Sequence, residues 1–154
     1  IAARKAQTDG TAVRFDRGYS YALPYADNRF ERALSSLFFH HLTRTHKEWT
    51  LREIHRVLQP GGELHVADWG RPRNALARGL FLSIQLLDGF ETTDDNVAGR
   101  LPSLMAAAGF KGVNAVGHIQ TMYGTLTLFR AAKINGREFR PAGRTSIEDI
   151  TQRR

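Results

Sequence analysis

Two pairs of neighbouring residues have the chemistry of an active site, His40-His41 and Asp68-Trp69. Each pair stands at the end of a short apolar stretch. An imidazole titrates near neutral pH, so it can accept a proton from a substrate or contact it directly. A carboxylate at the carboxyl edge of an open α/β sheet lies where such sheets bind ligands. We therefore predict catalytic roles for His41 and Asp68 and substrate contacts for His40 and Trp69.

A structural role remains open for each of these side chains. The two histidines could cap carbonyl groups at the end of a strand, and Asp68 could cap the next turn. A metal site is not predicted, because adjacent strand residues such as His40 and His41 point to opposite faces. The chain has no cysteine, which excludes disulfides, thiolate metal sites and cysteine nucleophiles.

A strand–helix–strand unit should position these pairs. The apolar run 34–39 predicts a buried strand. Thr45 and Glu48 have the spacing of a capping box, and apolar residues then recur at helical spacing. The segment Pro60-Gly61-Gly62 should end this helix, because proline cannot continue it. Residues 63–68 alternate in polarity and predict the second strand.

The rest of the chain predicts further elements of the same kind of sheet. Residues 12–16 indicate a short strand, and residues 74–88 and 102–108 indicate helices. Residues 113–121 and 125–131 read as two antiparallel strands joined through Tyr123-Gly124. This order predicts an α/β fold with an open, mostly parallel, doubly wound sheet and a C-terminal antiparallel hairpin.

Length and charge narrow the class of protein. The 154 residues suggest one domain, 1–132, and a basic, partly disordered tail, 133–154. The formal net charge is +7, but the arginines are scattered singly, so nucleic-acid binding is not expected. No run is apolar enough to span a membrane, and no signal peptide opens the chain, which favours the cytoplasm. The sequence leaves the oligomeric state open.

Four segments, taken in order, carry a resemblance to a known family. They are Leu23-Pro24-Tyr25 followed by Asn28-Arg29-Phe30, the run from Ser35 to Leu42, the run RVLQPGG from Arg56 to Gly62, and MAAAGF from Met105 to Phe110. Over about residues 1–132 the chain resembles the class I S-adenosylmethionine-dependent methyltransferases. The likeness is greatest to their small-molecule, quinone-biosynthesis branch.

The resemblance implies a Rossmann-like sheet and methyl transfer from S-adenosylmethionine to a small-molecule acceptor. The family binds this cofactor on a glycine-rich loop after its first strand, and that loop has no counterpart before Gly10. We therefore expect the N-terminal strands of the fold to be missing from this sequence. The alternative reading is a non-catalytic, methyltransferase-like module for binding or interaction.

The resemblance also assigns roles to residues. The expected cofactor contacts are Gly18, Tyr19, Ser20, Leu23, Ser36, Leu37 and Phe38. Tyr19 follows Gly18 where the family often has an acidic residue near the adenine, and a tyrosine ring could stack on the purine instead. Phe81, Gln85 and Tyr123 are candidate contacts of the acceptor. Their alternative is a place in the ordinary core.

Overall fold

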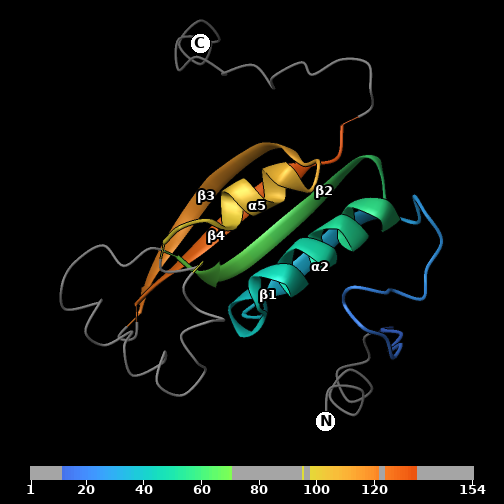
Figure 1. The fold of residues 1–154 in the computed structure, drawn as a ribbon, viewed down its shortest axis with the longest axis horizontal. Helices are drawn as coiled ribbons and strands as arrows, with labels where there is room; N and C mark the ends of the chain where they lie inside the picture. Colours follow the sequence, from blue (N-terminus) through green and yellow to red (C-terminus); the bar gives the residue numbers. More distant parts are fainter. Residues whose placement is uncertain (1–11, 71–94, 96–97, 122–123, 135–154) are drawn as a thin grey trace, which may run out of the picture.

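One four-stranded sheet organises the chain. The computed structural model describes residues 12–70, 95, 98–121 and 124–134. The strands lie in the order β1-β2-β4-β3 (Figure 1). Their bounds are β1 Phe30–Ser36, β2 Leu58–Trp69, β3 Lys111–Thr121 and β4 Gly124–Ala132. β1 pairs with β2 in parallel, whereas β4 pairs antiparallel with both β2 and β3. The α/β class and the C-terminal hairpin are confirmed.

Helix α2, Arg44–Val57, connects the two parallel strands. Its N-cap is Thr43, whose hydroxyl accepts a hydrogen bond from the backbone N–H of His46 at 3.4 Å. The predicted capping box at Thr45 was therefore placed two residues too late. The helix also ends before Pro60, because Leu58 is already extended and begins β2.

The strand predicted at 34–39 lies a few residues earlier in the structure. The apolar run 34–39 was expected to be buried, but β1 covers residues 30–36 and the side chain of Leu34 is 82% exposed. Leu37 has a φ of 49°, a left-handed conformation that ends the extended chain. A 3₁₀ turn, η1, follows at Phe39–His41. The two histidines therefore lie on a turn and not on a strand.

Some of the other secondary-structure predictions are confirmed and some are wrong. Residues 12–16 form no strand, and Val13 and Phe15 are half exposed. Helix α5, Leu101–Ala107, agrees with its predicted bounds within one residue. Both hairpin strands agree with their predicted bounds within two residues. The predicted helix 74–88 and residues 135–154 of the predicted tail lie outside the described residues. The backbone of Lys133 hydrogen-bonds with Gly61 and Gly62.

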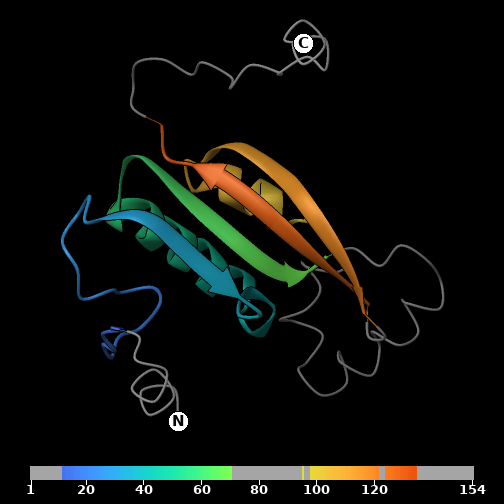
Figure 2. The ribbon, with the colours of Figure 1, turned by 180° about the vertical axis from the view of Figure 1, so that it is seen from behind.

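The core fills the space between the sheet and one layer of helices. Both α2 and α5 lie on the same face (Figure 1), and the view from behind shows the opposite face without a described helix (Figure 2). The largest fully buried apolar side chains are Phe39, Leu51, Leu58, Leu64, Val66, Leu101, Met105 and Phe110. Within the described part of the chain, no helix has the length and apolar character needed to cross a bilayer.

Candidate active site

The candidate residues gather at the carboxyl end of the parallel strands. β1 and β2 run side by side up to the pair Ser36 and Ala67, and their arrowheads point the same way (Figure 2). This edge of an open α/β sheet is the usual place for a ligand. The turn after β1 and the last two residues of β2 therefore form the centre of the candidate site.

Asp68 is fully buried at the end of β2. Its Oδ2 accepts hydrogen bonds from the backbone N–H groups of Phe38 and Phe39, at 3.1 and 2.7 Å. Its Oδ1 accepts from the backbone N–H of Trp69 at 2.8 Å and contacts Nδ1 of His40 at 2.7 Å. Both carboxylate oxygens thus hold the turn after β1 against the end of β2. In this arrangement Asp68 positions other residues and has no surface for a ligand.

The two histidines have different surroundings. His40 is 4% exposed, and its Nδ1 is held by Asp68. His41 is exposed, and its ring centre lies 3.9 Å from that of His40. Because both residues lie on a 3₁₀ turn, their rings face each other and do not point to opposite sides as a strand would require. Only His41 has the exposure that contact with a substrate needs.

The turn between β1 and η1 presents apolar side chains outward. Leu37 and Phe38 are 44% and 37% exposed, although both are large hydrophobic residues. The backbone of this turn is fixed, because the N–H of Leu37 donates to the carbonyl of Ala67 at 2.8 Å and Asp68 accepts from Phe38. The turn is therefore a rigid, apolar wall at the sheet edge.

The loop 18–23 is anchored on α2. The hydroxyls of Ser20 and Thr50 lie 2.8 Å apart, and the backbone N–H of Leu23 donates to Oε1 of Glu53 at 2.9 Å. The ring of Tyr19 is 68% exposed and stacks on Tyr21 with centroids 5.2 Å apart. The loop thus places an exposed aromatic ring beside the helix.

A groove brings part of the expected cofactor set together. It encloses about 470 Å³ between β1, α2 and the loop 18–23. Four of the seven expected cofactor residues line it: Ser20, Leu23, Ser36 and Phe38. Gly18, Tyr19 and Leu37 are not among its lining residues. The hydroxyl of Ser35, which also lines it, is buried and has no hydrogen-bond partner among the described residues.

A buried lysine near Asp68 was missed in the sequence. Lys47 of α2 is completely buried, and its Nζ lies 3.7 Å from Oδ2 of Asp95. Burial lowers the pKa of Lys47, and the nearby carboxylates of Asp95 and Asp68 oppose this shift. The signal in the sequence was its position four residues before Leu51, on the apolar stripe of the helix.

Of the remaining candidate contacts of the acceptor, only Trp69 lies among the described residues. Trp69 lies at the rim of a second cavity, at the end of β2. Phe81, Gln85 and Tyr123 lie outside the described residues. No group of three or more His, Asp or Glu side chains in the described ranges is arranged to hold a metal ion.

Comparison with known proteins finds similarity to methyltransferases. Residues 1–66 match the family described as the methyltransferase domain. The ubiquinone/menaquinone biosynthesis C-methyltransferase of Azotobacter vinelandii is 33% identical over 119 residues, which cover 66% of this chain. The chain is therefore similar in sequence to the class I S-adenosylmethionine-dependent methyltransferases. The same alignment covers 46% of the Azotobacter protein, so the chain spans a little under half of that relative's length.

Solved structures of other proteins share the fold. The YcgJ protein of Bacillus subtilis superposes with a TM-score of 0.68 at 16% identity, covering 88% of this chain and 77% of that one. An S-adenosylmethionine-dependent methyltransferase from Methanosarcina mazei gives a TM-score of 0.64 at 19% identity, covering 85% and 76%. S-adenosylmethionine is the methyltransferase family's cofactor, as the resemblance implied.

Proposed function

We propose that this protein transfers the methyl group of S-adenosylmethionine to a small-molecule acceptor. The observation that carries this proposal is the rigid apolar wall of Leu37 and Phe38, which Asp68 holds at the carboxyl edge of the sheet. The groove beside that wall also collects Ser20, Leu23 and Ser36, which the family resemblance marked as cofactor contacts.

The side chains present suit one side of the cofactor. The exposed ring of Phe38 would contact its flat adenine. The hydroxyl of Ser35, which has no hydrogen-bond partner among the described residues, would bond a polar group of the cofactor. When bound, the cofactor supplies an electrophilic methyl group on a sulfonium. The protein's own part is to hold donor and acceptor in line and to exclude water from the groove.

His41 is the side chain that would handle a proton. It is exposed at the same edge, whereas Asp68 is buried and holds His40. Methylation of an acceptor that must lose a proton needs a base close to the attacking atom, and an imidazole serves this role near neutral pH. We assign this role to His41 and a positioning role to Asp68 and His40.

The name of the similar Azotobacter enzyme supports a more specific acceptor. That protein is described as a C-methyltransferase of ubiquinone and menaquinone biosynthesis. We propose that the acceptor here is likewise a flat ring of the quinone type that carries oxygen substituents.

Calorimetric titration of the 154-residue chain with S-adenosylhomocysteine tests the proposal. We expect saturable binding in the micromolar range, about 8 kcal/mol of binding free energy. Phe38→Ala should weaken binding at least about tenfold, since it removes an apolar face from the groove. The control, Phe15→Ala, alters a ring that is 52% exposed and does not line the groove, so this variant should bind normally. Absence of binding by the wild-type chain would favour the non-catalytic module.

Transfer of a labelled methyl group to a hydroxylated naphthalene tests the chemistry itself. His41→Ala should lower turnover by about 100-fold, which is typical for loss of a general base. Binding of S-adenosylhomocysteine should stay unchanged in this variant. His65→Ala is the control, because His65 hydrogen-bonds Glu63 on β2, away from the carboxyl edge. Equal losses in both variants would contradict the role of His41.

A further inference from the structure

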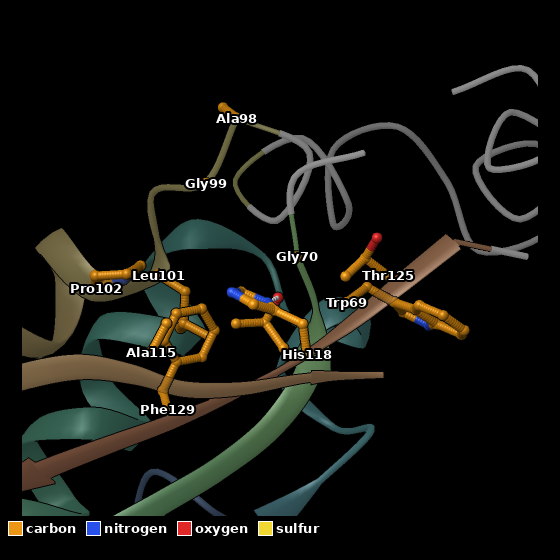
Figure 3. A pocket seen from close by; sticks show the side chains of 11 residues that line it. Trp69, Gly70, Ala98, Gly99, Leu101, Pro102, Ala115, His118, Thr125 and Phe129 are labelled. Carbon is orange, nitrogen blue, oxygen red and sulfur yellow. Dashed lines mark hydrogen bonds between the residues drawn. The ribbon is translucent and has the colours of Figure 1, made fainter. Parts of the chain in front are cut away.

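A second cavity lies at the carboxyl end of β2, on the face of the sheet that carries α5. It measures about 350 Å³, within the range of small-molecule sites. Its walls come from the end of β2, the segment before α5 with the first residues of that helix, and the two hairpin strands (Figure 3). They are formed by Trp69, Gly70, Ala98, Gly99, Leu101, Pro102, Ala115, His118, Thr125, Thr127 and Phe129.

The cavity has an apolar side and a polar side. Phe129 and Leu101 lie together on one side in Figure 3, and both are buried. On the other side Nδ1 of His118 contacts Oγ1 of Thr127 at 3.2 Å. The hydroxyl of Thr125, a buried residue, donates to Oε1 of Gln120 at 3.2 Å. The His118 ring itself is exposed, so it can exchange hydrogen bonds with a bound molecule.

The end of β2 reaches the polar side because of a glycine. The N–H of Gly70 donates to the carbonyl of Thr125 at 2.9 Å. A Cβ added at Gly70 would lie 2.1 Å from Oγ1 of Thr127, which no side chain could accommodate without displacement. The backbone next to Trp69 therefore lies directly against the polar side of the cavity.

The wall before α5 is fixed by charges. The carbonyl of Asp95 accepts from the backbone N–H of Arg100 at 2.7 Å, and its buried carboxylate lies 3.7 Å from Nζ of Lys47. Arg44 also pairs with Asp95 at 3.5 Å. These contacts link Arg100, at the start of α5, through Asp95 to helix α2. The first residues of α5, which line the cavity, are thus held in place.

We propose that this cavity is the acceptor subsite, and that it takes a flat aromatic ring with a hydroxyl or carbonyl oxygen. The ring packs on Phe129 and Leu101, and the oxygen meets His118 and Thr127. The proposal rests on the proposed methyl transfer and adds the location of the acceptor and the residue that recognises its oxygen. Neither family resemblance nor the sequence pattern had pointed to His118.

The test is an NMR titration of the ¹⁵N-labelled 154-residue chain with 1-naphthol and with naphthalene. 1-Naphthol should shift the amide signals of Leu101, Ala115 and Thr127 more than those of helix α2. His118→Phe keeps a ring but removes its nitrogens, so it should weaken binding of 1-naphthol about tenfold, the usual effect of losing one good hydrogen bond. The affinity for naphthalene should hardly change in this variant.

A pair of neighbouring substitutions locates the site independently of His118. Ala115 lines this cavity, whereas Val116 lines a groove on the other face of the sheet. Ala115→Leu should fill the cavity and abolish the shifts caused by 1-naphthol, and Val116→Leu should leave them intact. Equal effects of the two substitutions, or shifts confined to α2 and β1, would overturn the assignment of the cavity.

Failure of this subsite can be told apart from failure of the proposed function. If S-adenosylhomocysteine binds and methyl transfer is detected but 1-naphthol shifts other residues, the proposed function holds and the cavity is not the acceptor site. If 1-naphthol binds here while neither cofactor binding nor methyl transfer is detected, the acceptor role is overturned together with the function.

Discussion

At the scale of single residues, Asp68 determines the shape of the candidate site. Its two oxygens accept hydrogen bonds from three backbone N–H groups and contact His40. A carboxylate can satisfy so many donors because it has only acceptor positions. In asparagine an NH₂ group replaces one of these oxygens. That group is a donor, so it cannot accept the hydrogen bonds that the N–H groups now give to the oxygen.

Asp68→Asn should therefore lower the free energy of unfolding by about 3 kcal/mol, as expected for breaking a buried charged network. Urea denaturation followed by circular dichroism measures this. Asp27→Asn is the control, because Asp27 pairs with Arg56 through a side chain that is 68% exposed. The control should change stability by less than about 1 kcal/mol. Unchanged stability with lost turnover in Asp68→Asn would instead support the catalytic role predicted from the sequence.

At the scale of elements, one glutamate links three strands. Glu63 of β2 pairs with Arg32 of β1 at 2.8 Å and with Arg130 of β4, and it also contacts His65. The hydrogen bond from Arg130 is the main reason that the pKa of Glu63 falls to about 2, followed by the contact with His65. The ionised form of Glu63 is thus favoured in the folded sheet.

The pH dependence of stability follows from the sign of this shift. A carboxyl group with a lowered pKa in the folded state stabilises the fold above its ordinary pKa of 4.5, and this contribution is lost as pH falls towards about 2. Glu63→Gln should lower the melting temperature at neutral pH, and the difference from wild type should shrink below about pH 4. Glu48→Gln, which removes a looser 3.6 Å pair with Arg52, should show little effect at either pH. A constant difference at all pH values would contradict the assignment.

Sequence patterns predicted the elements best where polarity follows burial. β2 alternates from Glu63 onward and was found there, although its first five residues, 58–62, were not predicted as strand. Helix α5 and the hairpin strands were found within two residues. The strand predicted at 34–39 was wrong in its bounds for two reasons. β1 contains the charged residues Glu31 and Arg32, whose side chains are exposed, and the apolar residues Leu37 and Phe38 lie outside it. Apolar content alone therefore pointed to the wrong residues.

The candidate site could be predicted only in part, because its contacts join distant segments. The sequence indicated that His40 and Asp68 lie at the sheet edge. Their hydrogen bond depends on the 3₁₀ turn η1, and no pattern of residues in the sequence predicted this turn. His118 lies on β3 and reaches the cavity through its register with Thr127, and such pairings across strands are invisible along the chain.

At the scale of the whole molecule, the sheet is covered unequally. Both described helices pack on one face, and no described helix covers the other (Figure 2). Leu34, Val116 and Ile119 are exposed apolar residues of β1 and β3. A groove of about 330 Å³ crosses this face between Leu34 and Leu128. Exposed apolar strands at the side of a sheet promote association between molecules.

Leu34→Lys should therefore reduce self-association of the chain. The side chain is 82% exposed, so the substitution removes apolar surface at little cost in folding stability. Light scattering coupled to size-exclusion chromatography, over a range of protein concentrations, measures the change. Val13→Lys adds the same charge away from the sheet and should have a smaller effect. If both substitutions act equally, net charge and not this face controls association.

The left-handed backbone at Leu37 has an evolutionary consequence. Asn28 has a similar φ of 56°, but asparagine adopts this conformation readily. The same conformation at a leucine raises the free energy of the folded state by about 1 kcal/mol. Selection for heat resistance would therefore favour glycine at position 37, which relieves the strain. Selection for ligand binding would retain leucine, whose exposed side chain forms part of the apolar wall. A mutant library sorted by each criterion in turn would drive this position in opposite directions.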